Sequence, residues 1–277
     1  MAPRGSTDVA RYGKYPIHGG HQGRDRLRVL SAAMAPVTGR LFDALDIDAG
    51  ARCLDVGCGG GDVCFELARR VGPRGFVLGI DTDEVKLHLA RGEAAALGLS
   101  QVGFRAADIT MPLDGPSFDV VYARFLLSHL PEPELALDRM MSALVPGGVL
   151  VLEDVDFSGY FCHPTCPAFW QYTQLYVSLA QRRGGDPYIG PRLPALLRAA
   201  GARDVDVDVV QPTALDGDIK RVAQLTMEGI ADALLEEKLA TSTDVTAIVG
   251  ELNAYARDPD TLMSLPRVIQ AWGRRPS

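Results

Sequence analysis

The sequence contains no apolar run that approaches the ~20 residues of a membrane span, and residues 1–20 hold no apolar core of signal-peptide length. Basic residues are also outnumbered, because 28 lysines and arginines against 35 aspartates and glutamates give a formal charge of −7. This balance argues against nucleic acid or an anionic membrane surface as a partner, since such contacts need clustered Lys and Arg. We expect a soluble, cytoplasmic protein whose partner is a neutral or cationic small molecule.

The cysteines form no recognisable framework. There are five of them, and no two make a C-x-x-C pair, which excludes a disulfide scaffold and a zinc knuckle. The segment CHPTC at residues 162–166 leaves two interpretations open, a pair of metal ligands or two thiols buried in a loop. The second is the commoner use of free cysteine, so we predict no metal site. The five positions are Cys53, Cys58, Cys64, Cys162 and Cys166.

Apolar segments alternate with helical patterns from residue 51 onward. This alternation is typical of parallel strands joined by crossover helices, and the Val, Leu and Ile content of the segments suits a sheet covered on both faces. The helical patterns between them end at Gly or Pro-Gly, as helices commonly do. We therefore predict an α/β fold with a doubly wound sheet. The expected strands are residues 51–56, 75–80, 102–106, 118–123 and 147–154.

The segments on either side of this core have different patterns. Residues 25–45 predict an amphipathic helix pair broken at Pro36. The strict alternation of residues 204–210 predicts a strand with one solvated face, and residues 261–275 predict a last strand despite their proline. Between these two strands, helical patterns at about 218–239 and 243–257 predict a cap over the strand ends.

The stretch CLDVGCGGGD, residues 53–62, places four glycines within five positions directly after the first strand. In a doubly wound sheet, ligands bind at this turn, where missing side chains let the backbone approach the ligand. The dinucleotide fingerprint G-x-G-x-x-G fails here, because Asp62 stands where its third glycine should be. The stretch instead fits acid-x-Gly-x-Gly-x-Gly. Its acid is Asp55.

With this loop, the chain resembles a class I S-adenosylmethionine-dependent methyltransferase of the small-molecule type, over residues 51–155. The resemblance implies a Rossmann-like, mostly parallel seven-stranded sheet with helical cap and lid insertions. The cofactor carries an ammonium and a sulfonium, so acids around a glycine loop complement its charge. The implied division is an N-terminal helical extension at 1–48 and a methyltransferase domain at 49–277, with a lid at 157–190 and a cap at 216–258.

The resemblance also assigns the cofactor contacts. Asp81 ends the second strand, where such folds place an acid that accepts both ribose hydroxyls. Asp81 could alternatively cap the next helix, although Thr82 or Asp83 can fill that role. Asp62 serves either the helix dipole or the amino group of the cofactor. The implied contacts are Asp55, Gly57, Cys58, Gly59, Gly61 and Asp62 in the loop, Asp81 and Thr82 at the ribose, Asp108 and Ile109 at the adenine, Ala123, Arg124 and Phe125 at the methionine portion, and Tyr15 and Gln22 from an N-terminal segment that folds over the cofactor.

Three residues are candidates for the chemistry. Methyl transfer is an in-line displacement that requires alignment and exclusion of water, and a general base is optional. His129 follows the fourth strand near the expected methyl position and is either that base or a structural residue. Arg124 either orients an acidic substrate group or pairs with a neighbouring carboxylate. Asp154, with Glu153 and Asp156 beside it, is the alternative base or a polar residue at a strand end.

Residues 157–181 contain no Asp, Glu, Lys or Arg but hold seven of the 19 aromatic residues of the chain. A surface loop rarely has this composition. It predicts a lid over an apolar or aromatic substrate pocket, or a contact surface in a homodimer. The candidate substrate contacts are Phe157, Tyr160, His163, Trp170 and Tyr176. The sequence thus favours methylation of a small, partly apolar molecule in bacterial specialised metabolism, with a non-methylating cofactor-binding sensor or scaffold as the alternative.

Overall fold

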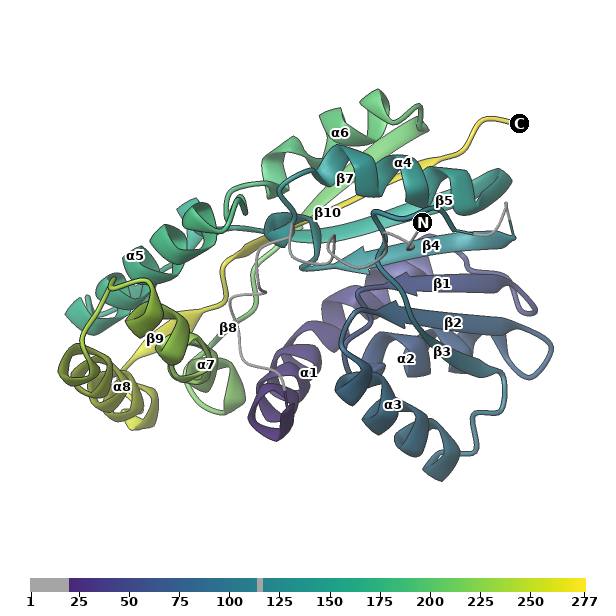
Figure 1. The fold of residues 1–277 in the computed structure, drawn as a ribbon. Helices are drawn as coiled ribbons and strands as arrows, with labels where there is room; N and C mark the ends of the chain where they lie inside the picture. The colour runs from purple at the N-terminus through teal and green to yellow at the C-terminus, as the bar shows by residue number, and fades with distance from the viewer. Residues whose placement is uncertain (1–19, 114–116) are drawn as a thin grey trace, which may run out of the picture.

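The computed structural model describes residues 20–113 and 117–277, with side chains from residue 26 onward. Its centre is a seven-stranded sheet in the order β3-β2-β1-β4-β5-β10-β7 (Figure 1). The first five strands in this order are parallel, and β10 is antiparallel to both of its neighbours. The predicted doubly wound, mostly parallel sheet is confirmed. The strands are β1 Arg52–Val56, β2 Phe76–Asp81, β3 Val102–Ala106, β4 Phe118–Arg124, β5 Leu144–Asp156, β7 Arg203–Val210 and β10 Arg267–Arg274.

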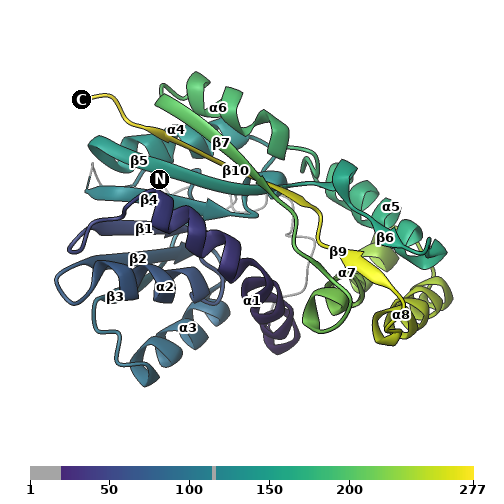
Figure 2. The same ribbon diagram turned by 180° about the vertical axis from the view of Figure 1, so that it is seen from behind.

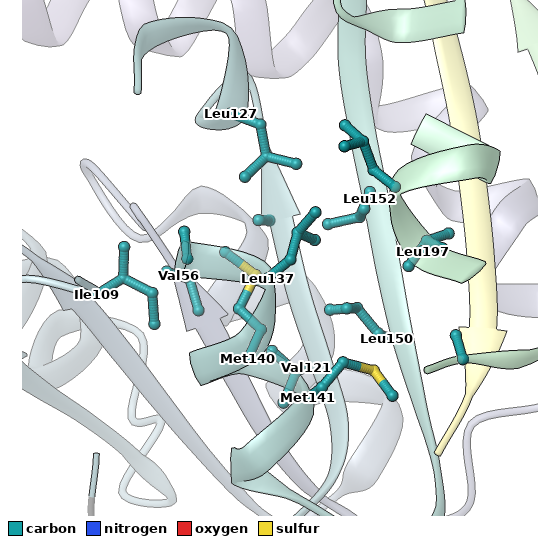
Figure 3. Packing of buried hydrophobic residues seen from close by; sticks show 14 of the residues in the cluster. Val56, Ile109, Val121, Leu127, Leu137, Met140, Met141, Leu150, Leu152 and Leu197 are labelled. Atoms are coloured by element: carbon teal, nitrogen blue, oxygen red, sulfur yellow. The ribbon is translucent and has the colours of Figure 1, made fainter. Parts of the chain in front are cut away.

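Helices cover both faces of this sheet (Figures 1 and 2). One face is covered by α1 Gly20–Ala44, α2 Asp62–Val71 and α3 Glu84–Ala96, and the other by α4 Pro133–Ala143 and α6 Leu193–Ala199. Figure 3 shows the core under α4, where Leu137 and Met140 pack against Val121 and Leu150 of the central strands. All four side chains are inaccessible to solvent, so the strand ends are held by a rigid support.

The N-terminal helix is continuous, and the predicted break at Pro36 is wrong. Proline inside a helix removes one backbone hydrogen bond, which costs free energy but can be tolerated when side chains hold the helix on both sides. Met34 and Phe42, on either side of Pro36, are completely buried. Thr38, between them, is hydrogen-bonded to the sheet through Glu153. Tertiary contacts therefore override the local preference for a break.

The C-terminal half also corrects the strand predictions. Pro266 divides the expected last strand into β9 Leu262–Ser264 and the sheet strand β10. β9 belongs to a separate three-stranded sheet with β6 Cys162–His163 and β8 Thr213–Ala214, which the sequence analysis did not predict. β7 lies at the sheet edge, and its Val207 and Val209 are exposed, so its alternation does not mark one buried face.

The cap consists of α5 Pro167–Arg182, α7 Val222–Glu236 and α8 Ser242–Arg257, together with the small sheet. Figure 1 shows these elements on the side of the main sheet where its parallel strands end. They have a hydrophobic core of their own, in which aromatic residues of α5 pack against Met227, Ile230 and Leu234 of α7. Short 3-10 turns join the elements, namely η1 Leu127–His129, η2 Phe157–Gly159, η3 Gly190–Arg192 and η4 Asp218–Arg221. None of the helices in the described parts of the chain is both long and apolar enough to cross a membrane.

Lys220 links two segments of the cap by hydrogen bonds. Its side chain is 1% exposed, and its ammonium donates to the carbonyl oxygens of Leu215, Asp258 and Thr261 at 2.9, 2.6 and 3.0 Å. These acceptors lie on the segments before η4 and after α8. A single cation therefore closes the two ends of the helical insertion onto each other.

We expect Lys220→Met to lower the free energy of unfolding by about 1–3 kcal/mol, because three buried carbonyl groups would lose their donor. Urea denaturation followed by circular dichroism measures the change. The matched control is Arg221→Met at the next position, whose exposed ion pair with Asp218 should contribute less than about 1 kcal/mol. Equal stability of the Lys220 variant and the wild type would contradict the role of this cation.

Candidate active site

A cavity of about 1310 Å³ lies between the carboxyl ends of the central strands and the cap. Its wall includes the turns that follow β1, β2, β3 and β4. The start of α3 and residues of α1, α5 and α7 complete it. This is the position at which doubly wound sheets bind ligands. The cavity therefore connects the glycine loop to the aromatic interior of the cap.

The glycine loop has the backbone conformation that excludes other residues. Gly57, Gly59 and Gly61 have φ angles of 70°, 53° and 83°, in the left-handed region that side chains disfavour. A Cβ atom on Gly61 would also lie only 2.8 Å from the ring of Phe104. Gly57, Cys58 and Gly59 line the cavity, whereas Gly61 packs against this ring behind the loop. The loop can take this shape because glycine has no side chain at these three positions.

Asp81, at the end of β2, lines the cavity and holds this loop in place. Its Oδ2 accepts a hydrogen bond from Gly59 N at 2.9 Å, and its Oδ1 accepts one from Asp83 N at 2.9 Å. The cap of α3 is Asp83, which accepts from the backbone of Val85 and Lys86. Asp81 is thus not the N-cap, and its carboxylate has lone pairs left for further donors.

Asp108 and Ile109 follow β3 and line the same end of the cavity, as does Thr82. Asp108 Oδ1 accepts from the backbone nitrogen and the hydroxyl of Thr110, at 2.9 and 2.8 Å. These bonds fix the turn, so the carboxylate and the apolar Ile109 side chain lie next to each other in a defined arrangement. Such a pair can bind the polar edge and the face of a purine ring.

Asp55 lies under the loop and is 2% exposed. Burial raises its pKa to about 6; a hydrogen bond from Cys64 and the charge of Arg124 lower it, while the charges of Asp81 and Asp62 add to the rise. Cys64 Sγ donates to Asp55 Oδ2 at 3.1 Å. The acids around the loop therefore create a negative potential that a cationic ligand would relieve.

Arg124 ends β4 and lines the cavity near these acids. Its guanidinium donates to Thr38 Oγ1 at 3.2 Å and to Ser31 Oγ at 3.1 Å, both on α1. Thr38 Oγ1 donates in turn to the fully buried Glu153, at 2.7 Å. Arg124 is therefore held by hydroxyl groups of α1, and the carboxylates of Asp55, Asp62 and Glu153 act on it through their charge.

His129 lines the cavity at the end of η1. Burial lowers its pKa to about 3, and the positive charges of Arg26 and Lys86 lower it further. The imidazole is consequently neutral at physiological pH. It can accept a hydrogen bond from a bound molecule, but it is a weak base in this environment.

Asp154, a predicted catalytic residue, does not line the cavity. It is 1% exposed, and its carboxylate accepts from the backbone nitrogens of Ser128 and Val155 at 3.1 and 2.8 Å. Asp156 is likewise engaged elsewhere, because Arg267 Nε donates to it at 3.0 Å. The expectation that Asp154 acts on a substrate is corrected: it fixes the turn that carries His129.

The aromatic residues of the predicted lid divide into two groups. Phe157, Tyr160 and Tyr176 line the cavity, and the rings of Phe157 and Tyr176 are stacked with centroids 4.6 Å apart. His163 and Trp170 do not line it, because both side chains lie on the outer surface, with Trp170 40% exposed. Sequence composition identifies a lid but not which of its faces points inward.

Several other predicted contacts lie apart from the cavity or outside the described residues. Ala123 is 2% exposed and packs in the core. Asp62 and Phe125 line the cavity with the residues named above. Tyr15 and the side chain of Gln22 are outside the described part of the chain. The sequence analysis missed lining residues at other positions, namely Arg26, Lys86, Tyr172, Arg183, Thr226, Asp232 and Glu236.

Comparison with known proteins agrees with this geometry. Residues 47–181 match a family described as a methyltransferase domain. The chain is 33% identical over 138 residues to the demethylmenaquinone methyltransferase of Staphylococcus carnosus, a match that covers 50% of this chain and 54% of that protein. It is 41% identical over 114 residues to the nocamycin O-methyltransferase of Saccharothrix syringae, covering 41% of each. The chain thus spans about half the length of these relatives.

Solved structures share the fold at low sequence identity. A protein of Bacillus halodurans C-125, solved as a candidate methyltransferase, has a TM-score of 0.57 at 19% identity and covers 92% of this chain and 100% of its own. A phosphoethanolamine N-methyltransferase of Haemonchus contortus, solved with S-adenosyl-L-methionine, has a TM-score of 0.54 at 17% identity and covers 92% and 53%.

The sheet, the glycine loop and these matches define one class of protein. Residues 47–181 match a methyltransferase domain, and a solved protein of the same fold holds S-adenosyl-L-methionine. The resemblance seen in the sequence is confirmed.

The burial of Asp154 predicts a pH-dependent stability. Its folded pKa of about 6 exceeds the 3.8 of a carboxyl group in water, so the folded state binds more protons between these two pH values. The stability of the wild type relative to Asp154→Asn should therefore fall as pH rises from about 4 to about 7, by roughly 3 kcal/mol in total. Urea denaturation of both proteins at several pH values measures this difference. A difference that stays constant with pH would show that Asp154 titrates normally.

Proposed function

We propose that this chain is an S-adenosylmethionine-dependent methyltransferase that methylates a small, partly apolar or aromatic molecule. The observation that carries the proposal is the continuous cavity, which has a glycine loop and strand-end acids at one end and an aromatic wall at the other. When bound, the cofactor supplies an electrophilic methyl group on a sulfonium. The chain has to bind it, align the acceptor and exclude water.

The residues at the sheet end fit this cofactor. Asp81 would accept hydrogen bonds from the ribose hydroxyls, while Asp108 and Ile109 would hold the adenine. The backbone of Gly57 and Gly59 leaves room for the amino-acid portion, as the left-handed conformation of the loop indicates. Asp55 and Asp62 would favour its ammonium and sulfonium charges, and binding of a cation would in turn favour the ionised form of Asp55.

Arg124 and Phe125 would lie at the amino-acid portion. The charges of Asp55 and Asp62 act on Arg124, and its guanidinium would attract the carboxylate of the cofactor. Its hydrogen bonds to Ser31 and Thr38 fix its position before any ligand binds. The helix α1 is therefore part of the binding site as well as of the fold.

The cap would hold the acceptor. Phe157, Tyr160, Tyr172 and Tyr176 present aromatic surface to the cavity, and Val222, Leu265 and Val268 extend it with aliphatic surface. Burial raises the pKa of Tyr160 well above its usual range and that of Tyr172 to about 12, so both hydroxyl groups stay protonated. The wall thus offers hydroxyl groups and ring faces, which suit a molecule with an apolar or aromatic body. The names of the two relatives specify small molecules as substrates, which supports the same substrate class.

A second candidate is a cofactor-binding sensor or scaffold that does not transfer the methyl group. The low pKa of His129 favours it, because an imidazole with a pKa of about 3 withdraws a proton from a hydroxyl group poorly. An acceptor that is already ionised or is nucleophilic at carbon would not need that base. Binding and transfer therefore have to be measured separately.

We expect Asp81→Asn to weaken the binding of S-adenosylhomocysteine by more than tenfold, because a charge-assisted hydrogen bond of about 1.5–3 kcal/mol is lost. Isothermal titration calorimetry measures the dissociation constant. Asp138→Asn, which makes the same change at an exposed position on α4, should leave it unaltered. An unchanged constant in the Asp81 variant would remove this residue from the cofactor site.

We expect the wild type to transfer a labelled methyl group to at least one molecule in a panel of aromatic and polyketide acceptors. His129→Ala should reduce that turnover about tenfold to a hundredfold, since it removes the acceptor of a hydrogen bond beside the reacting group. Its affinity for S-adenosylhomocysteine should stay the same. Tight cofactor binding with no transfer to any acceptor would favour the sensor or scaffold.

A further inference from the structure

Three cations line the cavity outside the set of residues that would hold the cofactor, and one of them, Arg183, lies near Glu236 and Glu237. The other two are buried. Arg26 projects from α1 and is 7% exposed, and Lys86 projects from the first turn of α3 and is 8% exposed. Removing a charge from water is costly unless an opposite charge or strong acceptors are close. A cavity that has two such cations in its wall is suited to an anion.

The hydrogen bonds around Arg26 leave a donor available. Its Nε is buried and has no hydrogen-bond partner within the described ranges 20–113 and 117–277. Buried donors of this kind are normally satisfied by protein, water or ligand. Lys86 Nζ lies 3.5 Å from Asp83 Oδ2, and the other oxygen of Asp83 is already bonded to the backbone of α3. The carboxylate of Asp83, which lies next to Lys86, therefore also caps α3.

The two cations have a common neighbour in the wall of the cavity, the imidazole of His129. Both Arg26 and Lys86 act electrostatically on His129, and Arg26 also acts on the hydroxyl of Tyr172 in α5. Arg124 has different neighbours, namely Asp55, Asp62 and Glu153. Arg26 and Lys86 therefore share His129 as a neighbour, whereas the acids that act on Arg124 include Asp55 and Asp62 of the glycine loop.

We propose that the methyl acceptor is an acid, a molecule with an aromatic or apolar body and a carboxylate or similar anionic group that Arg26 and Lys86 bind beside His129. This inference rests on the proposed function and names its substrate class. Guanidinium and ammonium groups together bind a carboxylate by charge-assisted hydrogen bonds, with Arg26 supplying the planar donors. The aromatic wall of Phe157, Tyr160 and Tyr176 would contact the body of the same molecule.

Anion binding would also change the state of His129. Its positive neighbours oppose protonation of the imidazole, and a bound carboxylate would offset their charge. The imidazole would then become a stronger base only in the complex with the acceptor. The same two cations would in this way both select the substrate and prepare the residue next to it.

The test uses matched acids and amides as probes, namely benzoate and benzamide, cinnamate and cinnamamide, and 2-naphthoate and 2-naphthamide. Each is titrated calorimetrically into the wild type, Arg26→Gln and Lys86→Gln, with and without saturating S-adenosylhomocysteine. The matched control is Arg28→Gln on the same helix, whose exposed side chain pairs with Glu93. Thermal unfolding confirms that each variant is folded.

We expect at least one acid to bind the wild type about tenfold more tightly than its amide. Each of the two glutamine variants should remove most of this preference, and the Arg28 variant should keep it. The dissociation constant of S-adenosylhomocysteine should change by less than about twofold in all of them.

Three results would overturn the inference. The first is that no acid binds more tightly than its amide. The second is that the acid preference survives in both glutamine variants. The third is that these variants weaken S-adenosylhomocysteine about tenfold while acid binding is unaffected, which would assign the cations to the carboxylate of the cofactor. Failure of the wild type to bind S-adenosylhomocysteine would instead refute the proposed function, and the titrations without it would still decide whether the cavity selects acids.

Discussion

One buried carboxylate supports the whole floor of the cavity. Glu153 has no solvent exposure and accepts hydrogen bonds from Thr38 of α1, Tyr122 of β4 and Gln270 of β10. A charge in this position needs every one of its donors, because an unpaired buried carboxylate is strongly destabilising. Thr38 also accepts from Arg124, so the same bonds fix α1, the end of β4 and the cation next to the glycine loop. The positions of these groups are set before a ligand arrives.

The cap is organised independently of this floor. Its hydrophobic cluster consists of residues from β5 onward, with little contribution from the elements that form the glycine loop. Lys220 closes its two ends, and stacked aromatic rings form its inner wall. A separate core of this kind allows the cap to differ in sequence without disturbing the glycine loop. It is consistent with the low identity between this chain and solved structures that share its fold.

The parts of the site that could be predicted from sequence are those whose requirements are local. A glycine loop with left-handed φ angles has no alternative residue, and Asp81 and Asp108 stand at fixed distances behind strands that periodicity identifies. Pro36 could not be placed in this way, because the contacts that keep α1 continuous come from residues more than 100 positions away, such as Glu153. Asp154 looked like a candidate base for a different reason, because a sequence does not show that the oxygens of a carboxylate accept from backbone nitrogens, here those of Ser128 and Val155.

The charge proposed for the acceptor shows that the net charge of a chain does not predict the charge of the molecule it binds. A net charge of −7 favours a neutral or cationic partner, yet the interaction of a bound group depends on the charges within a few ångströms of it. Most acids of the chain are exposed and screened, whereas Arg26 and Lys86 are nine-tenths buried in the wall of the cavity. Their field is weakly screened there and acts on His129, whose pKa falls to about 3. A globally acidic protein can therefore hold two buried cations close to one imidazole, here Arg26 of α1 and Lys86 of α3.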